Sequence, residues 1–545
     1  MLAGRAPFAA SSPADTVSGI LHKEVEIPAH REIPPGLSRV LIRCLEKSPD
    51  GRFQSARDLA FAFETLSGLE KDTGQRAAAR SERESRSIAV LPFVDMSPGK
   101  DQDYFCEGMA EEIMNALASL PGLRVAARSS AFRFKGGEHD LRSVGQALDV
   151  RTVLEGSVRT AGSRLRVTAQ LNEVDTGYQI WSRRYDRQMD DVFAVQDEIA
   201  ADIVEALRIE VAETDSPRVV RHTENQEAYH LYLRGRHHWY ARTKGALSKA
   251  REYYEQAVEK DPHYALPHVG IADVYTIQGI YGFVEEREAA QKAKASLEKA
   301  RRINDGLPEL LRTEGFILLF FDWDFRGATR SWEKAVELDP SSSLSQIWLG
   351  FSVWKGREDV SLAAVRRAQE LDPLNLYIIS VGAGVLDFWD RSEEAMKECQ
   401  KALDMDGSYL VGLYFFGGAC SKLGRHEEAL AAFQKAAAIS ERAPFYLGWL
   451  GWAQARAGRR EEARAVFAEL EERSKREHVP PLNLAVIAGA LGEKDRAFAL
   501  LDEAVQKRSC WLCSPRMPFF EDLRSDPRFD AHLKRLGYPD ETLRR

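Results

Sequence analysis

Two cysteines near the end of the chain have a spacing that can carry redox or metal chemistry. Cys510 and Cys513 form a C-x-x-C pair, which is typical of thiol–disulfide sites and of half a zinc site. A redox pair needs a helix N-terminus at its first cysteine, but here a predicted helix (497–507) precedes the pair and two prolines follow it. Zinc would need two further ligands, and none lies nearby at a suitable spacing. We therefore interpret both residues as structural thiols, with a redox or metal role as the alternative.

A basic cluster is the second group of residues that could bind a ligand. Arg124, Arg128, Arg133 and Lys135 lie close together in the sequence. Such a cluster can bind an anion, but the solvated rim of a domain produces the same pattern. We favour the rim.

No set of residues predicts catalysis. Glu155, Asp175 and Asp186 could supply an acid pair, but their spacing places them in separate strands or turns. The chain has no Ser/His/Asp arrangement and no phosphate-binding loop, and the Gly136-Gly137 pair alone carries little weight. We expect no catalytic residues, no cofactor and no metal.

The composition is that of a globular protein with more than one domain. The chain has 545 residues, 44% of them hydrophobic, and a net charge of -8, which does not favour nucleic-acid binding. Six cysteines in this length argue against a disulfide framework. No run approaches the about 20 apolar residues of a membrane span, and the N-terminus does not resemble a signal peptide. We expect a cytoplasmic protein without a transmembrane segment that does not bind nucleic acid.

The elements that must position these residues follow a repeat. A column of small residues comprises Ala250, Ala293, Ala328, Ser361, Ala395, Ala429, Ala463 and Ala497, and its last four steps are 34 residues each. A second column, five residues ahead, holds Gly356, Asp390, Gly424, Gly458 and Gly492. This period predicts pairs of closely packed helices with a tight turn between them. Asp-Pro pairs at 261, 339 and 372 should end the second helix, and stacked pairs form a solenoid.

These columns resemble the tetratricopeptide repeat (TPR) over residues 224–505. The matching positions are Gly417, Gly424, Ala429, Phe433 and Ala436, followed by Gly451, Gly458, Ala463 and Phe467. The match is poorer between Ala250 and Ala293, where about nine extra residues should lengthen a turn near 279–288. The resemblance implies a superhelical array of about eight helix pairs whose groove takes a protein or peptide.

The resemblance also implies partner-binding residues. In the TPR family the first helix of each pair lines the groove, and those positions correspond here to Tyr377, Tyr414, Lys422, Trp452 and Arg456. Aromatic and arginine side chains are frequent interface anchors. Packing of the aromatic residues between helices explains each of them equally well.

The first 69 residues contain three short motifs, Pro34-Pro35-Gly36-Leu37, the stretch 44–49 and Arg52-Phe53-Gln54-Ser55-Ala56. They resemble the last helices of the C-terminal lobe of bacterial Ser/Thr protein kinases. The Gly-rich loop, lysine and catalytic motifs that phosphoryl transfer needs do not occur in this chain. The resemblance implies that Arg52 normally pairs with a glutamate of one missing motif, so Arg52 should be unpaired or paired differently. We interpret 1–69 as a truncated kinase-lobe remnant from a larger kinase, with a pseudokinase remnant kept as a docking piece as the alternative.

A linker (70–86) and a separate α/β domain (87–213) come next. We expect buried strands at 88–93 and 123–127, helices at 107–120 and 140–148, and a long helix at 191–211. Two hairpins should lie between the last two helices. In one of their strands Leu165, Val167, Ala169 and Leu171 alternate with polar residues, as in a half-buried strand. Gly162 and Gly177 supply the turns.

This domain resembles the TolB-N-like domain that lies between bacterial signalling domains and TPR arrays. The matching segments are 88–93, 104–108, 132–135, 153–159 and 191–199. The resemblance implies a sensory or assembly module that follows kinases, nucleotide cyclases or winged-helix domains in other proteins.

Together these features predict a multidomain protein: a short all-α kinase-lobe remnant, a small α/β domain, a TPR solenoid (214–507) and a C-terminal cap (508–545). The expected function is a protein–protein interaction scaffold of bacterial signalling that is not catalytic as this chain stands. The alternative is the C-terminal part of an ATP-dependent Ser/Thr protein kinase. A winged-helix DNA-binding regulator is disfavoured, since nothing before Ile88 resembles a recognition helix with basic flanks.

Overall fold

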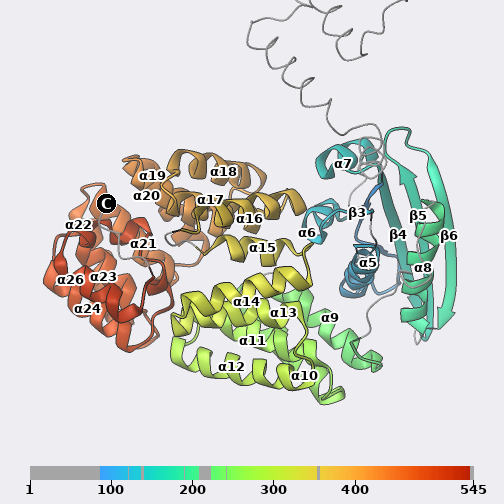
Figure 1. Ribbon diagram of the computed structural model, residues 1–545, viewed down its shortest axis with the longest axis horizontal. Coiled ribbons are helices and arrows are strands. Elements are labelled where there is room, and N and C mark those ends of the chain that lie inside the picture. The colour runs from blue at the N-terminus through green and yellow to red at the C-terminus, as the bar shows by residue number, and fades with distance from the viewer. Residues whose placement is uncertain are drawn as a thin grey trace, which may run out of the picture. The chain divides into compact units, whose positions relative to one another are not determined.

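Helices dominate the part of the chain that the structure describes, and a six-stranded sheet precedes most of them (Figure 1). The computed structural model describes residues 86–539 except 119, 121, 137–139, 189–190, 208–221, 241 and 353–355. The expected kinase-lobe remnant (1–69), Arg52 and all but the last residue of the expected linker lie outside the described residues.

The sheet has the strand order β3-β1-β4-β5-β6, and β2 also pairs with β4. The strands are β1 (Ser87–Val90), β2 (Val94–Asp95), β3 (Arg124–Val125), β4 (Thr152–Ala161), β5 (Arg164–Glu173) and β6 (Gln179–Gln188). β1 runs parallel to β3 and β4, whereas β4, β5 and β6 form an antiparallel meander. The sheet is therefore mixed.

The predicted alternation of β5 is confirmed. Leu165, Val167, Ala169 and Leu171 are at most 1% exposed, because successive strand residues point to opposite faces and this set shares the inner one. Gly162 has φ 62° and lies in the turn between β4 and β5, where the left-handed backbone favours a residue without Cβ.

Four helices belong to this α/β region: α5 (Asp103–Ala118), α6 (Arg128–Ala131), α7 (Leu141–Leu148) and α8 (Val192–Ala206). Helix α5 packs on β1, β2 and β3, helix α8 packs on β5 and β6, and the two helices contact each other. Asp140 caps α7 by accepting from the amides of Arg142 and Ser143. Both long helices were predicted, although α5 begins four residues earlier than expected.

Eight helix pairs follow in the described part of the chain. Their first helices are α9 (Gln226–Tyr240), α11 (Ala265–Ile280), α13 (Pro308–Ile317), α15 (Ser343–Gly350), α17 (Leu376–Phe388), α19 (Leu410–Lys422), α21 (Pro444–Arg456) and α23 (Pro481–Ala490). Their second helices are α10 (Lys244–Lys260), α12 (Glu286–Ile303), α14 (Phe325–Leu338), α16 (Glu358–Leu371), α18 (Ser392–Met405), α20 (His426–Ile439), α22 (Arg460–Arg473) and α24 (Lys494–Gln506). A π-helical turn (Leu318–Asp322) extends α13.

The predicted column of small residues lies inside the pairs. All eight members, seven alanines and Ser361, are at most 1% exposed. A larger side chain at these positions would separate the two helices of a pair, because helices approach to 8–10 Å according to the residues at the contact. The column therefore determines how closely each pair packs.

The predicted turn column has the expected left-handed backbone. Its five members have φ between 60° and 83°. At Gly424 the next amide, of Arg425, donates to the carbonyl of Cys420 at 2.8 Å, and Arg459 and Gln454 repeat this bond at Gly458. This is the Schellman arrangement that ends a helix and starts a tight turn.

The Asp-Pro pairs and the long repeat also agree with the sequence prediction. Helices α10, α14 and α16 end at the residue before Asp261, Asp339 and Asp372, since proline cannot donate the next backbone bond. The extra residues of the long repeat lie partly in a turn, 281–285, and partly in the longer helices α11 and α12.

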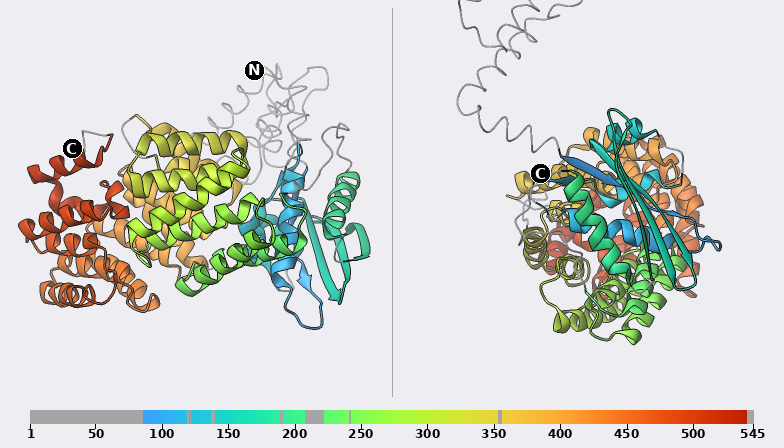
Figure 2. Two further views of the ribbon diagram at one scale, coloured as in Figure 1. Left: turned by 90° about the horizontal axis from the view of Figure 1, so that it is seen from below. Right: turned by 90° about the vertical axis from the view of Figure 1, so that its right-hand side faces the viewer.

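The array turns far enough for distant repeats to touch. Trp511 donates to the carbonyl of Ile280 at 3.1 Å, and His478 lies 3.0 Å from Glu286. Trp511 belongs to a 3-10 turn (Cys510–Cys513), which a further turn (Pro518–Phe520), α25 (Glu521–Arg524) and α26 (Pro527–Leu536) follow. The last helices, coloured red in Figure 2, lie at the end of the array away from the sheet. Among the described helices, none combines the length and the apolar character that crossing a bilayer demands.

Replacing Gly424 by alanine tests the turn column. The added Cβ would meet no atom within 4 Å, so the expected loss of about 1 kcal/mol in the free energy of unfolding comes from the left-handed backbone alone. Gly245→Ala in α10 is the control, because this glycine also has open space but no positive φ. Chemical denaturation measures both, and an equal effect of the two substitutions would contradict the assignment.

Candidate partner-binding cavity

A cavity of about 1440 Å³ lies inside the array. The first helices of several pairs line it, with side chains such as Tyr232 of α9, Asp273 of α11, Arg312 of α13 and Tyr377 of α17. This is the inner surface of a superhelix, because the second helix of each pair packs on the outside of the first. The volume is enough for several residues of an extended peptide.

The α/β region contributes part of the cavity wall through the segment that contains α6. Ser130 donates to a carboxylate oxygen of Asp372 at 2.6 Å and accepts from the amide of Leu374 at 2.9 Å. Ser129 accepts from the side-chain amide of Asn375, the N-cap of α17, at 2.8 Å. These bonds connect α6 to the fifth helix pair, more than 240 residues later in the chain.

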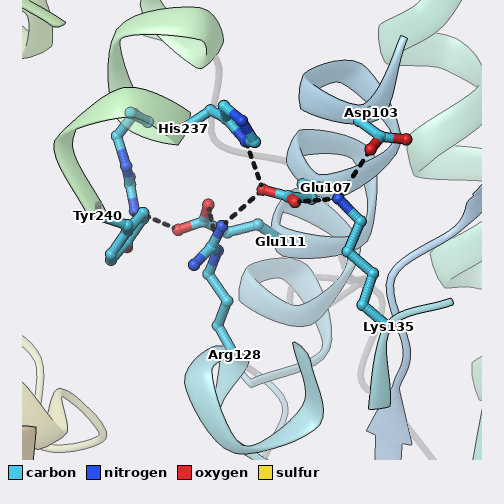
Figure 3. Close-up of polar contacts among 8 residues, drawn as sticks. Asp103, Glu107, Glu111, Arg128, Lys135, His237 and Tyr240 are labelled. Carbon is cyan, nitrogen blue, oxygen red and sulfur yellow. Dashed lines mark hydrogen bonds and ion pairs between the residues drawn. The ribbon is translucent and has the colours of Figure 1, made fainter. Parts of the chain in front are cut away.

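A network of ion pairs connects the same region to the first helix pair (Figure 3). Glu107 of α5 accepts from Lys135 at 2.8 Å and from Arg128 at 3.2 Å, and it contacts His237 of α9 at 3.1 Å. Glu111, one turn later, pairs with Arg128 and with Arg236 of α9. Helix α5 is thus held to α9 by charges on both elements.

The electrostatics of Glu107 reflect this network. Burial alone would raise the pKa of this carboxyl, but its bonds with His237 and Lys135 and the charge of Arg128 lower the pKa to about 2. The expectation that the basic cluster forms a solvated rim is therefore wrong for Arg128, whose side chain is 17% exposed and pairs with both glutamates. The sequence spacing could not reveal the whole network, since Arg236 lies 125 residues after Glu111 and His237 lies 130 residues after Glu107.

A second glutamate of α5 has the opposite shift. Burial, with the nearby charges of Glu111 and Glu309, raises the pKa of Glu112 to about 8. Its carboxyl is therefore mainly protonated at neutral pH and adds no charge beside Glu111.

Tyrosines and one arginine form the floor of the cavity. Tyr281, Tyr377 and Tyr409 line it and are half-buried. The guanidinium carbon of Arg242 lies 4.4 Å from the ring centre of Tyr377 and 4.7 Å from that of Trp239. The sequence analysis did not select Arg242, because it lies in a turn rather than on a first helix.

Of the five groove residues inferred from the TPR resemblance, the structure places one in the lining of the cavity. Tyr377 lines the cavity. Tyr414 is 4% exposed and Trp452 is 0% exposed. Lys422 pairs with Asp390 at 2.6 Å, and Arg456 pairs with Asp522 at 2.9 Å.

The chain's own C-terminal segment covers the inner surface near these residues. Phe519 stacks on Trp449 with ring centres 3.8 Å apart, and its ring lies 4.9 Å from that of Trp452 and 5.6 Å from that of Tyr414. This half of the inner surface is therefore occupied from within the molecule. The aromatic residues of the C-terminal segment are the sequence feature that could have predicted that the segment covers the inner surface.

The C-x-x-C pair lies in the same segment. Cys510 and Cys513 are 2% and 4% exposed. Burial raises the pKa of both thiols, that of Cys513 to about 12, whereas a reactive thiol needs a lowered pKa. No group of three or more metal-ligating residues occurs among the residues that the structure describes. Burial and pKa both favour structural thiols.

A family model identifies the repeats. The model described as "Tetratricopeptide repeat" matches residues 412–442, which contain most of α19 and all of α20. The chain therefore contains TPR units, whose fold binds protein or peptide partners in general.

Two curated relatives match parts of the chain. "Putative adenylate cyclase 3" of Rhizobium meliloti (strain 1021) is 42% identical over 187 residues, which are 34% of this chain and 32% of the relative. "Transcriptional regulator HilA" of Salmonella typhimurium is 24% identical over 160 residues, 29% of this chain and 28% of the relative. The chain spans about a third of the length of the curated relatives it matches.

Solved structures similar to the chain include other helical repeat proteins. YrrB, described as a TPR protein with an unusual peptide-binding site, is 18% identical, with a TM-score of 0.24, and covers 36% of this chain and 95% of its own. A monomeric mutant of IFIT1 with Gppp-AAAA is 17% identical, with a TM-score of 0.34, and covers 58% of this chain and 79% of its own.

Replacing Glu107 by glutamine tests the ion-pair network. Because the folded pKa of about 2 lies below the ordinary value of 4.5, Glu107 stabilises the fold above pH 4.5, and this contribution is lost as the pH falls toward 2. The substitution should lower the free energy of unfolding by about 3 kcal/mol at pH 7. The free energy of unfolding of the variant should also fall less than that of the unaltered protein between pH 4.5 and pH 2. Denaturation at several pH values measures this.

The control is Glu461→Gln. Glu461 is 87% exposed and pairs only with Arg464 of its own helix, so a change under about 0.5 kcal/mol is expected. An unaltered pH profile of the Glu107 variant would refute the role of this network.

Replacing Phe519 by alanine tests the occupied half of the inner surface. This ring is 2% exposed, so the cavity it leaves should lower the free energy of unfolding by about 3–5 kcal/mol. Cleavage after residue 507 by a protease should also become faster. Tyr178→Ala, at a side chain that is 77% exposed, should change neither, and equal protease resistance of the two variants would contradict the docking of the segment.

Proposed function

We propose that this chain is a non-catalytic interaction module of bacterial signalling that captures an extended peptide in its central cavity. The observation that carries the proposal is the cavity of about 1440 Å³ on the inner surface of a TPR array. Aromatic side chains from several first helices surround it, and such residues anchor most protein–peptide interfaces.

We place the partner in the part of the inner surface that the C-terminal segment leaves uncovered. There Tyr377 and Tyr409 keep part of their surface exposed, whereas Tyr414 and Trp452 lie under the C-terminal segment. Of the five groove residues inferred from the TPR resemblance, we therefore retain Tyr377 as a partner-binding residue.

The signalling context is supported by the relatives. One is named an adenylate cyclase and another a transcriptional regulator. Because these names denote different activities and the matches cover about a third of each, the matched parts are best explained as modules that serve several signalling outputs. We assign the α/β region to the TolB-N-like type on the segments quoted above and place the protein in the cytoplasm.

A second candidate is the C-terminal part of a Ser/Thr protein kinase. It rests on the motifs within residues 1–69, which lie outside the described residues. A coding sequence in the same frame ahead of Met1 that carries the kinase motifs would favour it, and the array would then be a docking arm.

Peptide selection tests the proposed function. Random dodecapeptides displayed on phage are selected on the full chain, and the enriched sequences are synthesised and their affinities measured by fluorescence anisotropy. Replacing Tyr377 and Tyr409 together by alanine should weaken binding by at least about tenfold, since each substitution removes an aromatic anchor. Tyr178→Ala, outside the cavity, should leave the affinity unchanged.

Thermal unfolding of each variant establishes that the fold is retained. Unchanged affinity of the double variant would reject the cavity as the binding site, and failure to enrich any peptide would reject peptide capture.

A further inference from the structure

Seven of the fifteen charged residues that line the cavity form ion pairs within the described part of the chain. Glu111 pairs with Arg236, and Asp273 pairs with Arg312 at 3.2 Å. Asp372 accepts bonds from two serines, and Glu477 pairs with Arg473. The paired charges therefore do not by themselves select a ligand, and the lining residues without an ion pair, of which Arg242 is one, matter more.

Arg242 differs from these residues. It makes no ion pair with any residue that the structure describes, although it is half-buried at the floor of the cavity. Its planar group instead lies against the rings of Trp239 and Tyr377. Stacking of this kind covers the face of a guanidinium and leaves the N–H groups at its edge available.

Arg242 has a backbone conformation that glycine adopts more easily than other residues. Its φ is 51°, in the left-handed region, which strains a residue with a Cβ. In four of the five turns of the predicted column, the residue with this left-handed backbone is a glycine. Arg242 therefore places a half-buried cation at a turn that also strains its backbone.

The surrounding groups suit an anion. Tyr281, Tyr377 and Tyr409 lie close enough to Arg242 to act on its pKa. Burial raises the pKa of Tyr377 and Tyr409 well above the ordinary tyrosine value, so both hydroxyls keep their protons and can donate. A guanidinium edge and phenolic hydroxyls together match a carboxylate or a phosphate.

We propose that the floor of the cavity recognises an anionic side chain of the captured peptide, with Arg242 as its cationic partner and the tyrosine hydroxyls as further donors. This inference rests on the proposed function, because it specifies the chemistry of the peptide that the cavity takes. The anionic group is the carboxylate of an acidic residue or the phosphate of a phosphorylated one.

Three short fluorescein-labelled peptides, amidated at the C-terminus, test the inference. Each alternates alanine with glutamate, with phosphoserine or with glutamine, and anisotropy gives its affinity for the full chain. The glutamate or the phosphoserine peptide should bind at least about tenfold tighter than the glutamine peptide. The tighter of the two identifies the carboxylate or the phosphate as the ligand. General attraction cannot produce this preference, because the chain has a net charge of -8.

Substitution of the arginine completes the test. Arg242→Gln should remove the preference for the charged peptides, and Arg242→Lys should retain part of it, since lysine keeps the charge without the planar fork. The control is Arg464→Gln, at an arginine that is 49% exposed on α22 and far from the cavity lining, and it should keep the full preference. Thermal unfolding establishes that the variants are folded.

Two results would overturn the inference: equal binding of the three peptides, or a preserved preference in Arg242→Gln. Equal binding that Tyr377→Ala weakens would leave peptide capture standing while removing the anion site. Absence of binding by all three would also reject the anion site, whereas peptide capture is decided separately by the phage-selected sequences.

Discussion

Close packing at a column of buried small residues is the constraint on which the array depends. Seven alanines and Ser361 let the two helices of each pair approach, and none is more than 1% exposed. Because each pair repeats the same helix–turn–helix unit, the pairs stack side by side and produce a superhelix. The inner surface of that superhelix is what encloses the cavity.

Two segments from outside the repeats shape this inner surface. The α6 segment of the α/β region bonds to the start of α17 through Ser130 and Asp372, while Glu107 and Glu111 hold α5 to α9. The C-terminal segment covers the other half with Phe519 and Trp511. The cavity is the part of the inner surface that these two segments leave open. Ion pairs bound it on one side, and aromatic rings form its floor.

The charges of the cavity follow one physical rule. A half-buried charge is costly unless it has a partner, and seven of the fifteen charged residues of the lining have an ion-pair partner within the described part of the chain. The same rule lowers the pKa of Glu107 and keeps Glu112 protonated near neutral pH. An arginine that the rule leaves without a carboxylate is therefore the informative group.

The sequence by itself determined the local structure: the helix pairs, their turns at Gly424 and Gly458, the buried alanines and the alternating strand β5. These features depend on short-range rules, because left-handed turns need glycine and paired helices need small contacts. Only the tertiary structure decided that Phe519 covers Trp452, that Arg128 joins an ion-pair network and that Arg242 lies at the cavity floor. Those outcomes depend on contacts between residues from different elements, such as Phe519 with Trp452 and Arg242 with Tyr377, and residue spacing carries no information about them.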